Sequence, residues 1–147
     1  MLAKSWTLIL MALAGSPALA APAALPPGVA FYSAAEIPGT VGKPLAMGPT
    51  YNQGLYLRTV DGEVEIHRDW NDTFLVLEGR ATVVLGGKVE GARQPGPGES
   101  LGGTQSGGVA QAVGPGDVLF IPASTPHHTR LAPGVTAFRT FVFKSRP

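Results

Sequence analysis

Short apolar stretches separated by glycine and proline dominate the hydrophobic pattern of this chain. The pair Asp61-Gly62 is a typical hairpin turn between two such stretches. Eight to ten short antiparallel strands without a helical period predict an all-β fold, a closed barrel or jelly roll. A barrel of this size encloses room for one small ligand. The expected strands are residues 29–32, 45–47, 51–60, 63–69, 73–78, 81–85, 109–113, 117–121, 127–132 and 135–144.

Residues 63–69 alternate between two faces of the expected strand. One face is mostly apolar and carries Val64, Ile66 and Arg68. Every side chain of the other face is ionisable, namely Glu63, Glu65, His67 and Asp69. Such a face, on a strand between two other strands, is explained if it lines a polar cavity or carries a metal ion. A solvent-exposed sheet face is the alternative explanation.

Two other segments differ in composition from the rest. Residues 73–78 enclose an uninterrupted apolar run, which predicts a strand buried on both faces. Residues 88–108 are rich in Gly, Pro, Ser and Gln. A loop of that length inside a compact domain is uncommon and is often functional or mobile. We therefore interpret this segment as a loop at the mouth of the barrel.

The segment 114–128 presents a histidine at the start of a strand. Its Gly-Pro-Gly at residues 114–116 supplies a tight turn. Residues 117–121 are apolar and rich in β-formers, which predicts a buried strand before a second, proline-bracketed turn. The next strand begins with His127, which we expect to face the interior. His128 then faces the opposite side, as a structural or exposed residue.

The first twenty residues read as an export signal. Residues 7–14 form an apolar run, which is too short to span a bilayer because a span needs about 20 residues. Ala18-Leu19-Ala20 is a small-x-small cleavage signal. We expect cleavage after Ala20 and a periplasmic or secreted protein. The predicted organisation is a signal peptide at residues 1–20, an N-terminal leader with an edge strand at 21–50, and a barrel at 51–147.

Removal of the signal changes the charge. Residues 1–20 hold one lysine and no acid, so the net charge falls from +1 to 0. A neutral chain lacks the basic footprint that nucleic acids and anionic membranes select, and we expect neither as a partner. The sequence contains no cysteine, so stability must come from a packed core and not from disulfides.

Two spaced motifs carry the candidate chemistry. The first runs from Glu65 and His67 through Asp72 to Gly79, and the second comprises Gly116, Pro122, Ser124 and His127. They resemble the two motifs of the cupin superfamily, specifically of small single-domain bacterial cupins of the conserved-barrel type. That resemblance covers residues 51–144 and implies a cupin-type double-stranded β-helix, or jelly-roll barrel. Ser124 stands where the family usually has glycine.

The resemblance also implies a divalent metal held by three histidines and one glutamate. In this chain Glu65 stands at the first histidine position, His67 at the second, Asp72 at the glutamate and His127 at the third histidine. A second register would place His67 first and Asp69 second. Imidazole and carboxylate ligands suit Fe, Mn, Ni or Zn. The alternative is a metal-free, hydrogen-bonded cluster of His67, Asp72 and His127.

Three functional hypotheses remain open at this point. The first is an exported barrel that binds a divalent metal and a small organic ligand. The second is a metal-dependent oxygenase or lyase acting on a small organic acid, in which whichever of Glu65 and Asp69 is not a ligand serves as a base. The third is a non-catalytic, metal-free barrel that forms a homodimer. We expect Arg58 and Arg139 to point outward, although either could hold a substrate carboxylate from inside the barrel.

Overall fold

The strands of the protein are short and separated by tight turns. The computed structural model describes residues 25–147, apart from the side chains of residues 39 and 40. The predicted export signal lies outside this range and stays a prediction. The described elements are a 3-10 turn η1 (Ile37–Thr40) and thirteen strands: β1 (Pro44–Met47), β2 (Tyr51–Arg58), β3 (Val64–His67), β4 (Asn71–Glu78), β5 (Ala81–Leu85), β6 (Lys88–Glu90), β7 (Arg93–Gly96), β8 (Glu99–Leu101), β9 (Thr104–Ser106), β10 (Val109–Val113), β11 (Val118–Ile121), β12 (His127–Leu131) and β13 (Phe138–Ser145).

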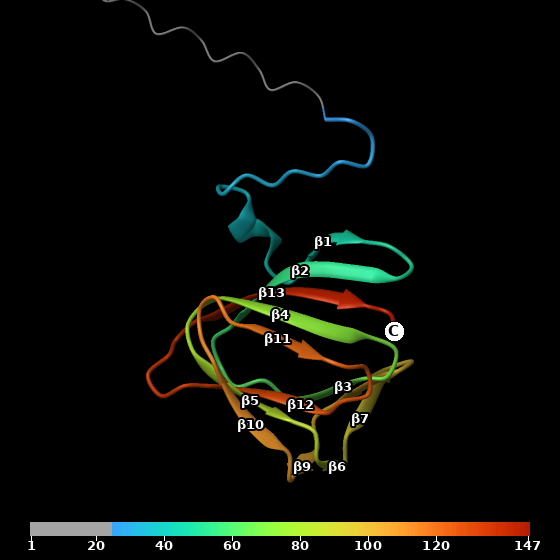
Figure 1. The fold of residues 1–147 in the computed structure, drawn as a ribbon, viewed down its shortest axis with the longest axis vertical. Helices are drawn as coiled ribbons and strands as arrows, with labels where there is room; N and C mark the ends of the chain where they lie inside the picture. Colours follow the sequence, from blue (N-terminus) through green and yellow to red (C-terminus); the bar gives the residue numbers. More distant parts are fainter. Residues whose placement is uncertain (1–24) are drawn as a thin grey trace, which may run out of the picture. The chain divides into compact units, whose positions relative to one another are not determined.

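Two antiparallel sheets form the barrel, as Figure 1 shows. A five-stranded sheet has the order β1-β2-β13-β4-β11, and a six-stranded sheet has the order β10-β5-β12-β3-β8-β7. Strands β6 and β9 pair with each other in a separate ribbon. The chain alternates between the two sheets from β2 to β5 and again from β10 to β13, as in a jelly roll, and the predicted all-β class is confirmed.

Alternate residues of these strands fill the space between the sheets. Phe74, Val76, Val83, Ile121 and Phe138 are buried there in one apolar cluster. The interior also buries polar side chains, namely His67, Asp72, His127, Thr129 and Thr140. Because buried polar groups cost free energy unless they are paired, these residues are the natural place to look for function.

The glycine-rich segment is ordered, contrary to the expectation of a loop. It forms strands β6 to β9, and β8 pairs with β3 so that residue Glu99 lies directly opposite His67. Its strands are only three or four residues long, and glycines with positive φ, among them Gly98 and Gly103, make the turns between them. Composition alone therefore hides these strands.

The strand at residues 73–78 was expected to be buried on both faces and the strand at 117–121 was expected to be buried, but each is buried on one face only. Leu75 and Leu77 of β4 are exposed, and Val118 and Phe120 of the edge strand β11 are 65% and 57% exposed. These four side chains lie on the outer face of the five-stranded sheet. That outer face is apolar like the inner face, so the hydrophobicity of the sequence does not show which of the two faces the interior.

The Asp61-Gly62 hairpin was also a wrong prediction, because β2 and β3 belong to different sheets. The chain crosses between the sheets here. The Leu131 amide donates to Asp61 Oδ1 at 2.8 Å, and the Gly62 amide donates to the Thr129 carbonyl at 2.8 Å. The turn-forming residues thus tie the crossing to β12 instead of joining neighbouring strands.

The leader contributes one strand. Residues 29–32 form no strand, whereas residues 45–47 lie within β1 at the edge of the five-stranded sheet. Between residues 25 and 147, no helix has the length and apolar character needed to cross a membrane.

Candidate functional site

The candidate site lies where strands of both sheets approach inside the barrel. Glu65 and His67 project from β3, and His127 begins β12 directly opposite Glu65. Asp72, near the start of β4, lies directly opposite Lys144 of β13. Because side chains alternate along a strand, residues 65 and 67 share the inner face, as the sequence pattern predicts. Four strands therefore deliver the polar groups of one cluster.

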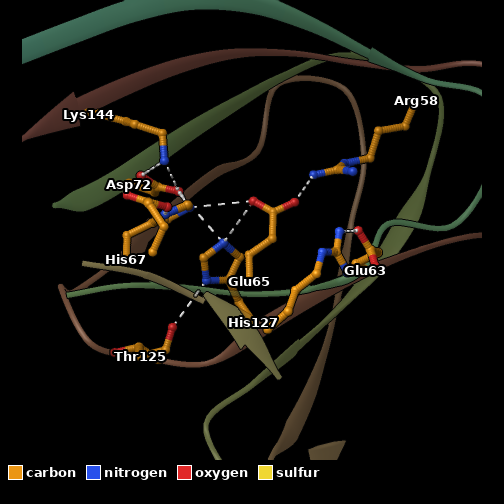
Figure 2. Close-up of polar contacts among 10 residues, drawn as sticks. Arg58, Glu63, Glu65, His67, Asp72, Thr125, His127 and Lys144 are labelled. Atoms are coloured by element: carbon orange, nitrogen blue, oxygen red, sulfur yellow. Dashed lines mark hydrogen bonds and ion pairs between the residues drawn. The ribbon is translucent and has the colours of Figure 1, made fainter. Parts of the chain in front are cut away.

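Two carboxylates and two imidazoles converge on a common point, as Figure 2 shows. His67 Nε2 lies 3.4 Å from Glu65 Oε2 and 3.4 Å from Asp72 Oδ2. His127 Nε2 lies 3.8 Å and 3.6 Å from the same two oxygens. The two imidazole rings are 5.3 Å apart between centroids. The four side chains named by the sequence motifs are therefore brought together, and Glu65, His67 and His127 meet the geometry of a metal-binding group.

Each imidazole is held through its other nitrogen. His67 Nδ1 contacts Glu99 Oε2 of β8, and His127 Nδ1 lies 3.1 Å from the Thr125 carbonyl. Because both partners are acceptors, each Nδ1 carries a proton, and in its neutral form each ring presents the Nε2 lone pair to the cluster. Within the described chain, both Nε2 atoms are buried and have no hydrogen-bond partner.

Two cations contact the carboxylates of the cluster. Arg58 Nη2 lies 2.5 Å from Glu65 Oε1. Lys144 Nζ lies 2.8 Å from Asp72 Oδ1 and 3.1 Å from Oδ2. The side chain of Asp72 is only 3% exposed, so the ammonium group compensates a carboxylate that is removed from water.

The surroundings shift the pKa values of three groups. Burial alone would raise the pKa of Glu65, but His67 and the charges of Arg58 and His127 lower it to about 2. Burial opposes protonation of His67, yet the neighbouring Glu65, Asp72 and Glu99 carboxylates raise its pKa above the ordinary value. Burial dominates at His127 and lowers its pKa. At neutral pH the cluster therefore holds an ionised Glu65 and a neutral His127.

A cavity of about 290 Å³ adjoins the cluster inside the barrel. Its polar lining comprises Tyr56, Arg58, Glu65, Asp72, Thr129, Thr140 and Lys144. Its apolar lining comprises Leu57, Phe74, Phe138 and Val142. Arg58 thus points inward, contrary to expectation. Arg139 does not line the cavity, and its Nε lies 3.6 Å from Glu78 on the neighbouring strand.

The structure separates the two proposed registers. Asp69 lies beyond the end of β3 and pairs with Arg68 in solvent, where both its oxygens accept from that guanidinium at 3.1 Å. It therefore stays outside the cluster, as does His128, the next residue along β12 after His127. The geometry favours the register that contains Glu65, His67 and Asp72.

Sequence reasoning missed Glu99 and Lys144. Glu99 lies in the glycine-rich segment, where no periodicity marked a strand. The alternation of side chains along β13 could have indicated the position of Lys144. Phe138, Thr140, Val142 and Lys144 share the inner face of that strand. A lysine at the end of such a series is ordinarily read as solvated.

The serine in the second turn also has a structural consequence. Ser124 has a φ of 65°, the only positive value among the non-glycine residues that the structure describes. Its amide donates to the His67 carbonyl at 2.8 Å, which ties the turn before His127 to β3. The backbone therefore has the conformation that favours glycine at this position, with serine adopting it at some cost.

Comparison with known proteins identifies the architecture. No protein-family model and no curated protein matches the sequence. Solved structures do match, among them the cupin domain of Schizosaccharomyces pombe Cnp3, with a TM-score of 0.51 and 12% identity over 69% of this chain and 60% of that one. The chain has the cupin fold.

Two further structures resemble this cupin barrel. Hydroquinone 1,2-dioxygenase PnpCD, solved with Cd²⁺ and 4-hydroxybenzonitrile, matches with a TM-score of 0.53 and 13% identity over 74% of this chain and 64% of that one. A Bacillus halodurans protein matches with a TM-score of 0.50 and 23% identity over 69% of this chain and 66% of that one. The match spans less than two thirds of each of these three chains.

Proposed function

We propose that this cupin barrel binds one divalent transition-metal ion through Glu65, His67, Asp72 and His127, and a small organic ligand in the adjoining cavity. The observation that carries the proposal is the pair of buried Nε2 atoms without hydrogen-bond partners among the described residues. Both aim at the same two carboxylate oxygens. A buried lone pair with no donor is costly, and a metal ion would satisfy two of them at once.

The donor set and its spacing fit such an ion. Metal–ligand bonds of about 2.1 Å in tetrahedral geometry separate the ligand atoms by about 3.4 Å. The four nitrogen–oxygen separations lie between 3.4 and 3.8 Å. Nitrogen and oxygen donors without thiolate suit Fe(II), Mn(II), Ni(II) or Zn(II). The Nδ1 contacts with Glu99 and Thr125 supply the outer hydrogen bonds that orient ligating imidazoles.

A catalytic role is the second candidate. A bound ion would supply Lewis-acid polarisation of a ligand oxygen. The similarity to a dioxygenase crystallised with Cd²⁺ supports an oxygenase as one such role, and a lyase is the other. In either case Arg58 would orient the substrate from the cavity wall, and the apolar lining would exclude water from it. Oxygen consumption by the iron-loaded protein during turnover would distinguish the oxygenase from a binding protein.

Metal content tests the proposal. The protein without its predicted signal, incubated in turn with Fe(II), Mn(II), Ni(II) and Zn(II) and then desalted, is expected to retain about one ion per chain in elemental analysis. His67→Ala combined with His127→Ala is expected to retain none, because it removes both nitrogen donors. His128→Ala is the matched control and should behave as the wild type. Wild-type protein without metal above background after all four incubations would refute the metal site.

The contact between Glu99 and His67 predicts an effect at a residue that is not itself a ligand. Glu99→Gln is expected to weaken zinc affinity by about 10- to 100-fold, the usual cost of losing such an outer partner. Competition with a chromogenic chelator measures the affinity. Glu90→Gln, on the exposed strand β6 of the same segment, should leave it unchanged. Equal affinities for the two variants would show that Glu99 does not position His67.

The metal-free homodimer is a third candidate, and the outer face of the five-stranded sheet favours it. Leu75, Leu77, Val118, Phe120 and Phe143 are exposed there on the neighbouring strands β11, β4 and β13. A second copy presents the same uncharged side chains, so a two-fold axis brings apolar surface onto apolar surface with no opposed charges.

The dimer predicts a change in mass. Light scattering should give twice the chain mass for the wild type, while Phe120→Lys should give the monomer mass because it places a charge within the apolar face. Glu90→Lys is the control on a different surface. A monomeric wild type at concentrations up to about 100 μM would contradict the dimer.

A further inference from the structure

We infer that the cavity takes a small monocarboxylate with an apolar body, and that Arg58 and Lys144 bind its carboxylate beside the proposed metal. This inference rests on the proposed metal site and adds to it the class of ligand. It is argued from the charges around the cavity, from the position of the two cations and from the nature of the walls.

The two cations face the cavity from the five-stranded sheet. Arg58 ends β2 and Lys144 lies near the end of β13, and both line the cavity. Figure 2 shows them reaching the carboxylate cluster from separate directions. Each contacts one carboxylate that the proposed metal would also contact, Glu65 for Arg58 and Asp72 for Lys144. When a metal ion binds those carboxylates, it competes with the cations for them.

Arg58 is also held in place. Gly62 lies against its guanidinium, where a Cβ atom would come within 2.8 Å of Nη1. The absence of a side chain at residue 62 therefore makes room for Arg58 to turn into the barrel. A guanidinium carries five N–H donors in a planar fork, and only Nη2 is used by Glu65. Arg58 therefore keeps donors for a carboxylate in the cavity.

The charge balance selects a single anion. Both imidazoles must be neutral to ligate the proposed metal ion, and the carboxylates of Glu65, Asp72 and Glu99 then exceed the cations Arg58 and Lys144 by one negative charge. A divalent ion would convert that excess into one positive charge. An uncompensated charge inside a barrel is costly, so a ligand with one negative charge completes the site. A phosphate monoester carries close to two negative charges at neutral pH, so its binding would leave the site with a net negative charge.

The walls decide what the rest of the ligand is. Phe74, Phe138 and Val142 give an apolar surface next to the cations. The hydroxyls of Tyr56, Thr129 and Thr140 are the polar groups of the remaining lining, which is too few for the many hydroxyls of a sugar. A short aliphatic or aromatic monocarboxylate matches both the walls and the charge.

Calorimetric titration of the zinc-loaded protein tests the inference. Zinc content is measured first on every sample. Butanoate is then compared with butanamide, which has nearly the same shape and no charge, and inorganic phosphate and glucose are titrated separately. Butanoate is expected to bind at least tenfold more tightly than the other three. Arg58→Gln and Lys144→Met are expected to weaken it by about 10- to 100-fold, and Arg139→Gln, outside the cavity, should leave it unchanged.

The two possible failures are distinguishable. A wild type that holds zinc but binds butanamide as well as butanoate overturns this inference and leaves the metal site intact. Tighter binding of phosphate or glucose overturns it as well, as does unchanged butanoate affinity in both cavity variants with zinc retained. A wild type that holds no zinc overturns the proposed function itself. The comparison of acid and amide on the wild type needs no variant to fold.

Discussion

The Lys144→Met variant is expected to lose about 3–5 kcal/mol of unfolding free energy in metal-free buffer and to recover most of it when zinc is added. Lys144 is the cation that contacts the almost fully buried Asp72 carboxylate. Removal of one partner of a buried ion pair leaves an uncompensated charge, and this accounts for the size of the loss. Zinc would replace the missing cation. By linkage, the variant should therefore bind zinc more tightly than the wild type does.

Urea unfolding with a chelator and with saturating zinc measures both effects. Lys88→Met, at an exposed position of β6, is the control and should change neither stability nor zinc affinity. Adding Asp72→Asn to Lys144→Met should restore stability in the presence of the chelator, because the double variant no longer buries an unpaired carboxylate. An equal loss with and without zinc would show that the metal does not contact Asp72.

The second large effect concerns acid stability. The carboxyl of Glu65 has a pKa of about 2 in the folded protein, against an ordinary value of 4.5. Between these pH values the unfolded chain binds a proton that the folded chain does not, so stability falls as the pH falls. The contribution is fully present above pH 4.5 and is lost as the pH drops through about 2. The difference between the two pKa values corresponds to about 3 kcal/mol.

The Glu65→Gln variant should lack this contribution. In metal-free protein, the difference in stability between wild type and variant is expected to shrink steadily from pH 5 to pH 2, as followed by urea unfolding. Glu63→Gln is the matched control, since Glu63 also pairs with an arginine, Arg93, but in solvent. Its difference from the wild type should change far less across this range, because solvent screens an exposed ion pair. Parallel curves for wild type and Glu65→Gln would contradict the low pKa.

The sequence predicted site residues where ionisable side chains follow the two-residue period of a strand. The alternation in residues 63–69 put Glu65 and His67 on one face, and these two lie inside beside His127, whereas Glu63 and Asp69 of the same face lie in solvent. Asp72 followed from its spacing to Gly79, and that glycine has a physical reason. Its φ is +78°, and a Cβ atom there would lie 2.2 Å from the Ala137 carbonyl. The glycine of the first motif is therefore required by the local backbone, which leaves no room for a side chain at residue 79.

Pairing between distant strands was not predictable in the same way. Glu99 reaches His67 only because β8 pairs with β3, 32 residues away in sequence, and no local pattern encodes that partnership. The exposure of Phe120 likewise depends on β11 being the edge of its sheet. A hydrophobic residue on the outside of a sheet has the same local pattern as one inside, so the inner face must be seen in the structure.

Three contacts of the candidate site join residues that lie directly opposite each other on neighbouring strands: Glu65 with His127, His67 with Glu99, and Asp72 with Lys144. If one of these strands slipped by a single residue during folding, its side chains would turn to the other face. Such a barrel could keep its backbone ladder but would lose the donor set. Binding of the proposed metal ion would therefore stabilise the correctly aligned barrel and would not stabilise barrels with a misaligned strand.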